Sequence, residues 1–541
     1  MLDWVLRGGT VVDGSGAPGF RAEVGIAGDR IAAIGDGLQG RQTLDCTGQV
    51  IAPGFIDTHS HSDLRILAEP TLPMKLLQGI TLEVLGQDGI SVAPVKPEER
   101  AASRQRLSGL LGDFGVAWDW STVADYLGCL EAARPAQDVA YLAPHGALRQ
   151  WVMGGGDREA GPQELAGLQQ ALRTALAEGA CGLSTGLIYP PCCYADTAEL
   201  IALGEVLAPG GEPFVVHLRS ESDHLLDAAQ EMVRVADQTG CAVHISHLKI
   251  AGAENWKHAE SLLAIFEEAQ ARGRRITADQ YPYAAGSTLL SAILPPWAHD
   301  GGLEPALSRL RDPRARAAMR QAMTASGSSD WDNFWRWTGP AGIVIADVPS
   351  GRHPEVVGRS LTEVAHRWSR DPVEAAFDLL LEENLGVAMI SMSQDEPIVE
   401  RFLTLPWASV GSDGLLGGRP HPRAFGSYPR ILGRYVREKG ILSLAQAVRK
   451  MTSEAARAFG FTDHGFLGQG LRANLVVFDP ETVADRATFE NPLQFAVGIR
   501  EVMVGGELVV RGGEVTGARP GRVVRKNPVT KTPRAARKAS E

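Results

Sequence analysis

The middle of the chain alternates short apolar segments with longer amphipathic ones, and this alternation limits the fold more than any other feature. Helical periodicity is clearest over residues 164–179, 224–240 and 258–273. Seven segments have the length and composition of strands: residues 81–88, 138–145, 182–189, 214–218, 242–249, 275–283 and 408–414. Strands that alternate with helices form parallel sheets. With the strand that leads into residues 54–61 they number eight, which predicts an α/β fold built on a (β/α)8 TIM-like barrel.

Both ends of the chain have a different pattern. In residues 1–52 and 466–518, short runs of Val and Ile alternate with polar residues, and Gly-rich turns separate the runs. This pattern is typical of antiparallel β-sheets. We therefore expect one small β-sandwich domain built from both chain ends, and a barrel domain over residues 53–465.

One connection is too long for a barrel loop. About 125 positions separate Tyr283 from Ala408, and residues 286–345 are rich in Pro and Trp. We expect this segment to be an insertion that could act as a lid. Residues 343–349 and 387–395 also have strand character, so the strand count stays open here.

Composition disfavours several classes of protein. The formal net charge of −11 disfavours non-specific binding of nucleic acid. No apolar run reaches about 18 residues, so no membrane span is expected, and the first residues lack the pattern of a signal peptide. Six cysteines without a C-x-x-C pair argue against a disulfide framework and favour a cytoplasmic protein. Residues 519–541 are basic and are expected to form a disordered tail.

The stretch GFIDTHSHSD places three polar side chains on one face of a strand end. Strand periodicity puts Asp57, His59 and His61 on the same side. Two imidazoles in this arrangement can share a metal ion, although a single H-x-H is also compatible with a pair of hydrogen-bonded histidines.

Three further residues end later strands, and this makes a metal centre the better interpretation. His217, His247 and Asp413 each follow an apolar run, so they face the same mouth of the barrel as His59 and His61. Imidazole and carboxylate ligands suit zinc, and this set can hold one or two ions. His244 has the opposite strand parity to His247, and packing against the surrounding helices is expected for it.

Six stretches together resemble one protein family: GFIDTHSHSD, VVHLRSE, ISHLK, DQYPYAAGST, VGSDG and HPRAFGSYPRILGRYV. They resemble the N-acyl-D-amino-acid deacylase (D-aminoacylase) family of the amidohydrolase superfamily, from about residue 3 to 517. The resemblance implies a zinc-bearing barrel that hydrolyses the amide bond of N-acyl-D-amino acids. Its expected partner is a small-molecule N-acyl amino acid, with no nucleic acid and no membrane.

The resemblance also implies a division of the ligands. His59 and His61 with Asp413 would form one metal site, and His217 with His247 the other. The chain departs from the family at Asp88, where the similar proteins carry a cysteine ligand. A carboxylate can ligate or bridge zinc as well, so Asp88 is a candidate shared ligand.

Two acids and their roles follow from the expected reaction. Asp413 is the candidate general base, which would accept a proton from water and pass it to the leaving amine. Asp57 is a candidate partner that orients a ligand histidine.

An N-acyl amino acid carries a free α-carboxylate, which requires cationic partners. Lys249 and Arg423 stand beside proposed ligands, and the resemblance supports them together with the hydroxyls of Tyr189 and Tyr283. Residues 284–308 contain no Lys or Arg and are expected to line part of the side-chain pocket, which favours neutral or hydrophobic D-amino acids.

Three alternatives stay open. A cyclic-amide hydrolase of the hydantoinase or dihydroorotase type is disfavoured because no lysine ends the strand 182–189. Deaminases of the superfamily carry a Glu three residues after a strand-end His, whereas Glu221 follows His217 by four. A non-catalytic barrel scaffold would be expected to lose ligands, yet all the His and Asp positions are present.

Overall fold

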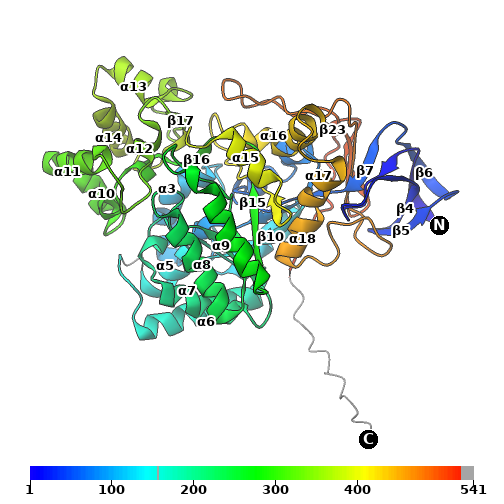
Figure 1. The fold of residues 1–541 in the computed structure, drawn as a ribbon, viewed down its shortest axis with the longest axis horizontal. Coiled ribbons are helices and arrows are strands. Elements are labelled where there is room, and N and C mark those ends of the chain that lie inside the picture. Colours follow the sequence, from blue (N-terminus) through cyan, green and yellow to red (C-terminus); the bar gives the residue numbers. More distant parts are fainter. Residues whose placement is uncertain (155–156, 526–541) are drawn as a thin grey trace, which may run out of the picture.

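Eight parallel strands form the centre of the molecule, as predicted. The computed structural model describes residues 1–154 and 157–525 (Figure 1). The barrel strands are β8 (Phe55–Asp57), β9 (Ile80–Leu85), β10 (Asp138–Tyr141) continued by β11 (Ala143–Pro144), β12 (Leu183–Gly186), β13 (Pro213–His217), β14 (Ala242–Ile245), β15 (Ile276–Gln280) and β19 (Ala408–Val410). Neighbouring strands pair in parallel from β8 to β19. A bridge between Ser60 and Gly414 and a 2.7 Å hydrogen bond from Asp413 N to His59 O close the ring.

Helices surround this barrel and bury apolar faces against it. They are α1 (Arg65–Ala68), α2 (Pro73–Leu76), α3 (Arg100–Leu111), α4 (Val123–Ala133), α5 (His145–Met153), α6 (Pro162–Glu178), α7 (Thr197–Leu207), α8 (Leu225–Thr239), α9 (Ala259–Ala271), α15 (Glu396–Leu403), α16 (Arg423–Arg430), α17 (Leu444–Met451) and α18 (Ser453–Phe459). Local sequence sets their ends. Asp196 caps α7 by accepting a hydrogen bond from Glu199 N, and Gly240 ends α8 in a left-handed conformation (φ 73°).

The long connection before the last barrel strand forms a separate lobe. Strands β16 (Gly286–Leu289), β17 (Ile343–Asp347) and β18 (Ala388–Ser391) pair antiparallel, outside the barrel. Helices α10 (Leu303–Arg311), α11 (Pro313–Thr324), α12 (Phe334–Thr338), α13 (Leu361–Trp368) and α14 (Pro372–Glu382) share an apolar core with this sheet. Because β18 belongs to the same sheet, the inserted lobe extends well beyond the expected end at residue 345.

The two chain ends form the β-sandwich at the opposite end of the molecule from the inserted lobe (Figure 1). One sheet has the order β5 (Arg30–Gly35), β4 (Glu23–Ala27), β1 (Leu2–Arg7), β6 (Gly40–Asp45). The other has the order β23 (Glu514–Val515), β22 (Glu507–Arg511), β21 (Ile499–Val504), β20 (Leu475–Phe478), β7 (Val50–Pro53), β2 (Thr10–Val11), β3 (Phe20–Arg21). The antiparallel β7–β20 pair joins the N-terminal to the C-terminal part of the chain.

The first residues of the expected disordered tail are part of the folded structure. Residues 519–525 pack on the barrel, where Val524 N donates a 2.7 Å hydrogen bond to Val139 O and Val523 forms a parallel bridge with Val139. Positions 526–541 of the expected tail lie outside the described residues. Among the described helices, none combines the length and apolar character needed to cross a membrane.

A buried carboxylate links the barrel to the C-terminal part of the chain. Asp138 on β10 is fully buried and accepts hydrogen bonds from His464 Nε2 (3.0 Å), Arg472 Nε (2.7 Å), Asn474 Nδ2 (2.9 Å) and Arg522 N (2.9 Å). These donors come from the segment that leads into β20 and from the chain after β23.

We predict that Asp138→Ala destabilises the protein by about 3–5 kcal/mol, because it leaves the buried Arg472 guanidinium without its main partner. The thermal unfolding midpoint measures this loss. Asp237→Ala is the control, because Asp237 forms a partly exposed ion pair with Arg274 and its removal should change stability by less than about 1 kcal/mol. Equal midpoints for the two variants would contradict the proposed link.

Candidate metal centre

Six buried side chains meet at the carboxyl ends of the barrel strands. His59 and His61 follow β8, Asp88 follows β9, His217 ends β13, His247 follows β14 and Asp413 follows β19. The ligand atoms form two groups, each lying within 4.8 Å of one another: His59, His61, Asp88 and Asp413, and Asp88, His217 and His247. Asp88 belongs to both groups, as the sequence suggested for a shared ligand.

The distances between these atoms fit zinc. Asp88 Oδ2 lies 3.5 Å from His59 Nε2 and 3.6 Å from His61 Nε2, and Asp413 Oδ1 lies 3.2 Å from His61 Nε2. Four ligands placed 2.0–2.2 Å from one tetrahedral zinc ion stand roughly 3.3–3.6 Å apart. The other carboxylate oxygen, Asp88 Oδ1, lies 3.6 Å from His247 Nε2. One carboxylate therefore faces both groups of histidines.

Several side-chain atoms of these six residues are buried without a hydrogen-bond partner among the described residues. They are both ring nitrogens of His59, His61 Nδ1, His217 Nε2 and Asp88 Oδ1. A buried polar atom without a partner costs about 1–3 kcal/mol. Unpaired imidazole nitrogens and carboxylate oxygens are the donors that a zinc ion requires, so the residues present fit this metal.

Three of the six residues have a strained backbone. Asp88 (φ 55°), His247 (φ 36°) and Asp413 (φ 48°) adopt the left-handed conformation although none is a glycine. Such a conformation costs on the order of 1–3 kcal/mol for each residue and is typical of functional sites. Specific hydrogen bonds hold it in place, such as the 2.6 Å bond from His247 N to Asp279 Oδ1.

The ionisation of the carboxylates and of His217 favours metal binding. Burial disfavours the charged form of Asp413, but the Arg423 guanidinium and the nearby imidazoles outweigh burial and hold its pKa well below the usual range. The pKa of Asp88 is also well below the usual range, because the histidines around it outweigh its burial. Burial lowers the pKa of His217 to about 3, so this imidazole is neutral and can act as a ligand.

Glu221 is a site residue that the sequence analysis used only to argue against a deaminase. Its Oε1 accepts a 2.5 Å hydrogen bond from Lys249 Nζ and lies 3.2 Å from His247 Nδ1. A carboxylate on Nδ1 orients the ring so that Nε2 faces the metal. The signal was its position four residues after His217, in the loop that follows the strand.

Two of the expected substrate-binding residues lie in the centre already paired with carboxylates. Arg423 is fully buried, with Nη1 2.9 Å from Asp413 Oδ2 and its guanidinium 4.4 Å from the centre of the Tyr281 ring. Lys249 is paired with Glu221. Tyr189 lines the same cavity, with its hydroxyl 2.8 Å from Thr288 Oγ1 of the inserted lobe.

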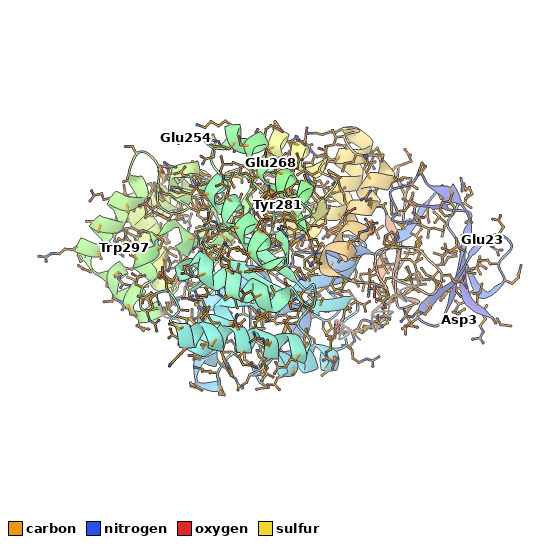
Figure 2. The ribbon with its side chains drawn as sticks, turned by 60° about the horizontal axis from the view of Figure 1, so that its bottom comes forward. Asp3, Glu23, Glu254, Glu268, Tyr281 and Trp297 are labelled. Carbon is orange, nitrogen blue, oxygen red and sulfur yellow. The ribbon has the colours of Figure 1, made fainter. Side chains whose placement is uncertain are left out.

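Tyr283 was expected in this cavity, and the structure corrects that expectation. Its hydroxyl donates to Asp485 Oδ2 at 3.4 Å, outside the cavity, whereas Tyr281 lines it. Figure 2 places Tyr281 near the middle of the molecule. The two tyrosines flank one proline, so the motif alone did not distinguish them.

Asp57 and His244 lie close to the ligands without belonging to them. Asp57 was expected to orient a histidine ring, but its Oδ1 accepts from the backbone nitrogens of His59 (3.3 Å) and Ser412 (2.7 Å). It positions the ligands through the main chain. His244 is not part of the ligand set: its Nε2 lies 3.0 Å from Asp279 Oδ2.

The inserted lobe covers the centre. Asp332 accepts hydrogen bonds from Ser220 Oγ (2.7 Å), Ser222 Oγ (2.7 Å) and Glu221 N (2.8 Å), so the lobe is fixed to the loop after β13. Phe334 and Trp337 line the cavity of the centre beside Tyr189.

A second cavity of about 330 Å³ adjoins the first, and Tyr189 and Phe334 line both. Most of its other lining residues are apolar, among them Leu107, Leu187, Ile188, Leu289, Leu294 and Leu385.

Comparison with known proteins agrees with this geometry. The sequence profile of the amidohydrolase family matches residues 42–510. An N-acyl-D-glutamate deacylase of Alcaligenes xylosoxydans xylosoxydans is 39% identical over 97% of this chain and 97% of its own length. A D-aminoacylase of the same organism is 37% identical, with the same coverage of both chains. The chain belongs to the N-acyl-D-amino-acid deacylase family of amidohydrolases.

The solved structures place this amidohydrolase with the same proteins. An N-acyl-D-glutamate deacylase from Bordetella bronchiseptica, complexed with zinc and a phosphonate inhibitor, is 36% identical and superposes with a TM-score of 0.83. The comparison covers 97% of this chain and 100% of that one. The barrel with a separate β-domain is therefore the fold of the family.

We predict a pH-dependent effect of Asp332→Asn on stability. Burial raises the pKa of Asp332 to about 6 from 3.8, in spite of its hydrogen bonds. Between these values the unfolded chain releases the proton and the folded chain keeps it, so the stability that Asp332 contributes falls as pH rises from about 4 to 6. The uncharged Asn has no such dependence.

The free energy of unfolding of Asp332→Asn, relative to that of the wild type, should therefore increase by up to about 3 kcal/mol as pH rises over this range. Thermal unfolding from about pH 3.5 to 7.5 measures the difference. Asp330→Asn, at an exposed position of the same segment, is the control and should show a constant difference. A constant difference for Asp332→Asn would contradict the prediction.

Proposed function

We propose that this amidohydrolase cleaves the amide bond of N-acyl-D-amino acids with the help of zinc, and releases a carboxylate and a free D-amino acid. The observation that carries the proposal is a pair of ligand groups that share Asp88, directly beside the cations Lys249 and Arg423. The names of the most similar relatives support the D configuration and the linear amide.

The two groups of ligand atoms support the division that the family resemblance implies. His59, His61 and Asp413 would hold one ion, His217 and His247 the other, and Asp88 would contact both. A bound zinc ion supplies a water of lowered pKa and polarises a carbonyl oxygen.

We infer that Asp413 transfers the proton from water to the leaving amine. The Asp413 carboxylate is ionised at neutral pH, which a proton acceptor requires. Arg423 on Oδ2 fixes the orientation of the carboxylate and leaves Oδ1 on the side of His61. The same carboxylate would then pass the proton to the leaving amine nitrogen.

The charges of the centre favour an anionic substrate once a metal is bound. Asp88, Asp413 and Glu221 carry three negative charges in the cavity, and Lys249 and Arg423 carry two positive ones. A single dication therefore makes the cavity positive. Lys249 and Arg423, with the hydroxyls of Tyr189 and Tyr281, are the candidates to hold the α-carboxylate.

The adjoining cavity favours neutral or hydrophobic side chains. Leu289 and Leu294, which line it, come from the stretch 284–308, which contains no Lys or Arg. Two basic residues from elsewhere also line it: Arg219 is neutralised by Glu231 at 2.9 Å, and Arg106 has no carboxylate partner among the described ion pairs. Arg106 is therefore the one Lys or Arg of the described lining that could pair with an acidic side chain, in a cavity that is otherwise mostly apolar.

The geometry disfavours the other reactions of the superfamily. The shared acid is Asp88 and strand β12 carries no lysine, so the centre lacks the carboxylated-lysine bridge of the hydantoinase type. A scaffold without metal would leave the buried ring nitrogens of His59 without partners.

A cytoplasmic location is part of the same proposal. All six cysteines lie among the described residues and none is in a disulfide. Four of them are buried. Free thiols are typical of proteins in a reducing compartment.

The test is a panel of N-acetyl-D-leucine, N-acetyl-D-methionine and N-acetyl-D-glutamate with their L counterparts, assayed by amine release with added Zn²⁺. We expect activity on the D compounds alone, with kcat/KM for leucine and methionine at least tenfold above that for glutamate. Asp413→Asn should lower kcat by about 10²–10⁴-fold. A preference for glutamate would overturn the assignment of the side-chain pocket, and full activity of Asp413→Asn would overturn the mechanism.

A further inference from the structure

A lysine ammonium group lies buried beneath the metal centre. Lys75, on the short helix α2, has no exposed surface. Its Nζ lies 2.6 Å from Asp57 Oδ2, 2.9 Å from Ser60 Oγ, 3.0 Å from Ser412 Oγ and 3.2 Å from Glu83 Oε2.

The position of Lys75 is costly unless it has a specific role. Taking an ammonium group and two carboxylates out of water costs several kcal/mol for each ion, and a buried ion pair is often no more stable than apolar residues of the same volume. Here Asp57, Glu83 and Lys75 are all fully buried. Stability alone is a weak reason for the arrangement.

Two of the four partners of Lys75 are adjacent to a metal-ligand candidate in the chain, and Asp57 lies two residues before His59. Ser60 lies between His59 and His61, and Ser412 precedes Asp413. Asp57 accepts from Ser412 N at 2.7 Å and from Ser412 Oγ at 2.6 Å. One ammonium group therefore connects β8, β9 and β19, the strands that four of the six ligand candidates follow.

The strained backbone of Asp413 is a reason for the contacts of Lys75 with the neighbouring chain. Asp413 has a φ of 48°, a conformation that relaxes unless the neighbouring chain is held. Ser412 is held by Asp57, and Asp57 is held by Lys75.

We propose that Lys75 is a positioning residue that holds His59, His61 and Asp413 in the arrangement that binds metal. It acts through Asp57, Ser60 and Ser412 and touches neither metal nor substrate. The inference rests on the proposed zinc site and goes beyond it, because it assigns the geometry of the ligands to a residue outside them.

The chain offers a matched control. Lys450 is also buried, and its Nζ donates to the backbone carbonyls of Leu405 and of Ala408 (3.0 Å), before and at the start of β19. Its described hydrogen-bond partners are not adjacent to any ligand. Lys450→Met removes a buried ammonium group, as Lys75→Met does, but leaves the carboxyl ends of the barrel strands untouched.

The experiment compares zinc affinity in the wild type, Lys75→Met and Lys450→Met, by competition with a chelator of known affinity. Circular dichroism checks the folding of each. We expect Lys75→Met to bind zinc about 10–100-fold more weakly, which is the usual effect of residues that orient ligands, and Lys450→Met to remain within about twofold of the wild type. The visible spectrum of the cobalt-substituted protein should change only in Lys75→Met, because it reports ligand geometry.

The outcomes separate the two proposals. If the wild type binds no zinc, the proposed function fails. If the wild type binds zinc and Lys75→Met binds it equally well, or if both lysine variants weaken it equally, the role of Lys75 is refuted.

A milder variant serves if Lys75→Met does not fold. Ser60→Ala removes a hydroxyl that contacts Lys75 Nζ at 2.9 Å and Glu83 Oε2 at 2.5 Å. Zinc affinity should fall by about three- to tenfold, with a change in the cobalt spectrum. An unchanged affinity and spectrum would refute the proposal.

Discussion

Buried negative charge at the mouth of the barrel is the constraint on which the rest of the site depends. Asp88, Asp413 and Glu221 are each about 5% exposed, and a buried carboxylate that stays ionised is usually paired with a cation or a metal. Arg423 neutralises Asp413 and Lys249 neutralises Glu221. Asp88 has no lysine or arginine partner among the described ion pairs and faces only histidines, so a metal cation is the charge that completes the centre.

The fold was predictable because its signals are local and repeated. Short apolar strands alternate with amphipathic helices, and all eight predicted barrel strands are present. The inserted lobe was harder to delimit. Residues 387–395 have strand character, and only pairing with β16 and β17 shows that this strand lies outside the barrel. Such pairing depends on contacts between segments about 100 residues (β16 and β18) and about 45 residues (β17 and β18) apart, which sequence periodicity does not encode.

The site residues that end a strand were predictable from the sequence. The residues that contact the ligands from a loop or a helix were not. His59, His61, His217, His247 and Asp413 meet because parallel strands end at one mouth of the barrel. Strand ends do not predict Glu221 or Lys75, because Glu221 lies in a loop and Lys75 lies on a short helix. Tyr283 was expected from the family resemblance, but the chain turns after β15, where Tyr283 N donates to Tyr281 O at 3.0 Å, and Tyr281 is the tyrosine that lines the cavity.

We propose that one carboxylate, that of Asp88, serves both groups of histidines, in a position where the similar proteins are expected to carry a cysteine. Anomalous diffraction at the zinc edge from crystals of the zinc-loaded protein tests it most directly. We predict two zinc peaks, one beside His59 and His61 and the other beside His217 and His247, with the two oxygens of Asp88 directed one to each. Two peaks with Asp88 turned away from both, or zinc bound without His59 and His61, would contradict the account.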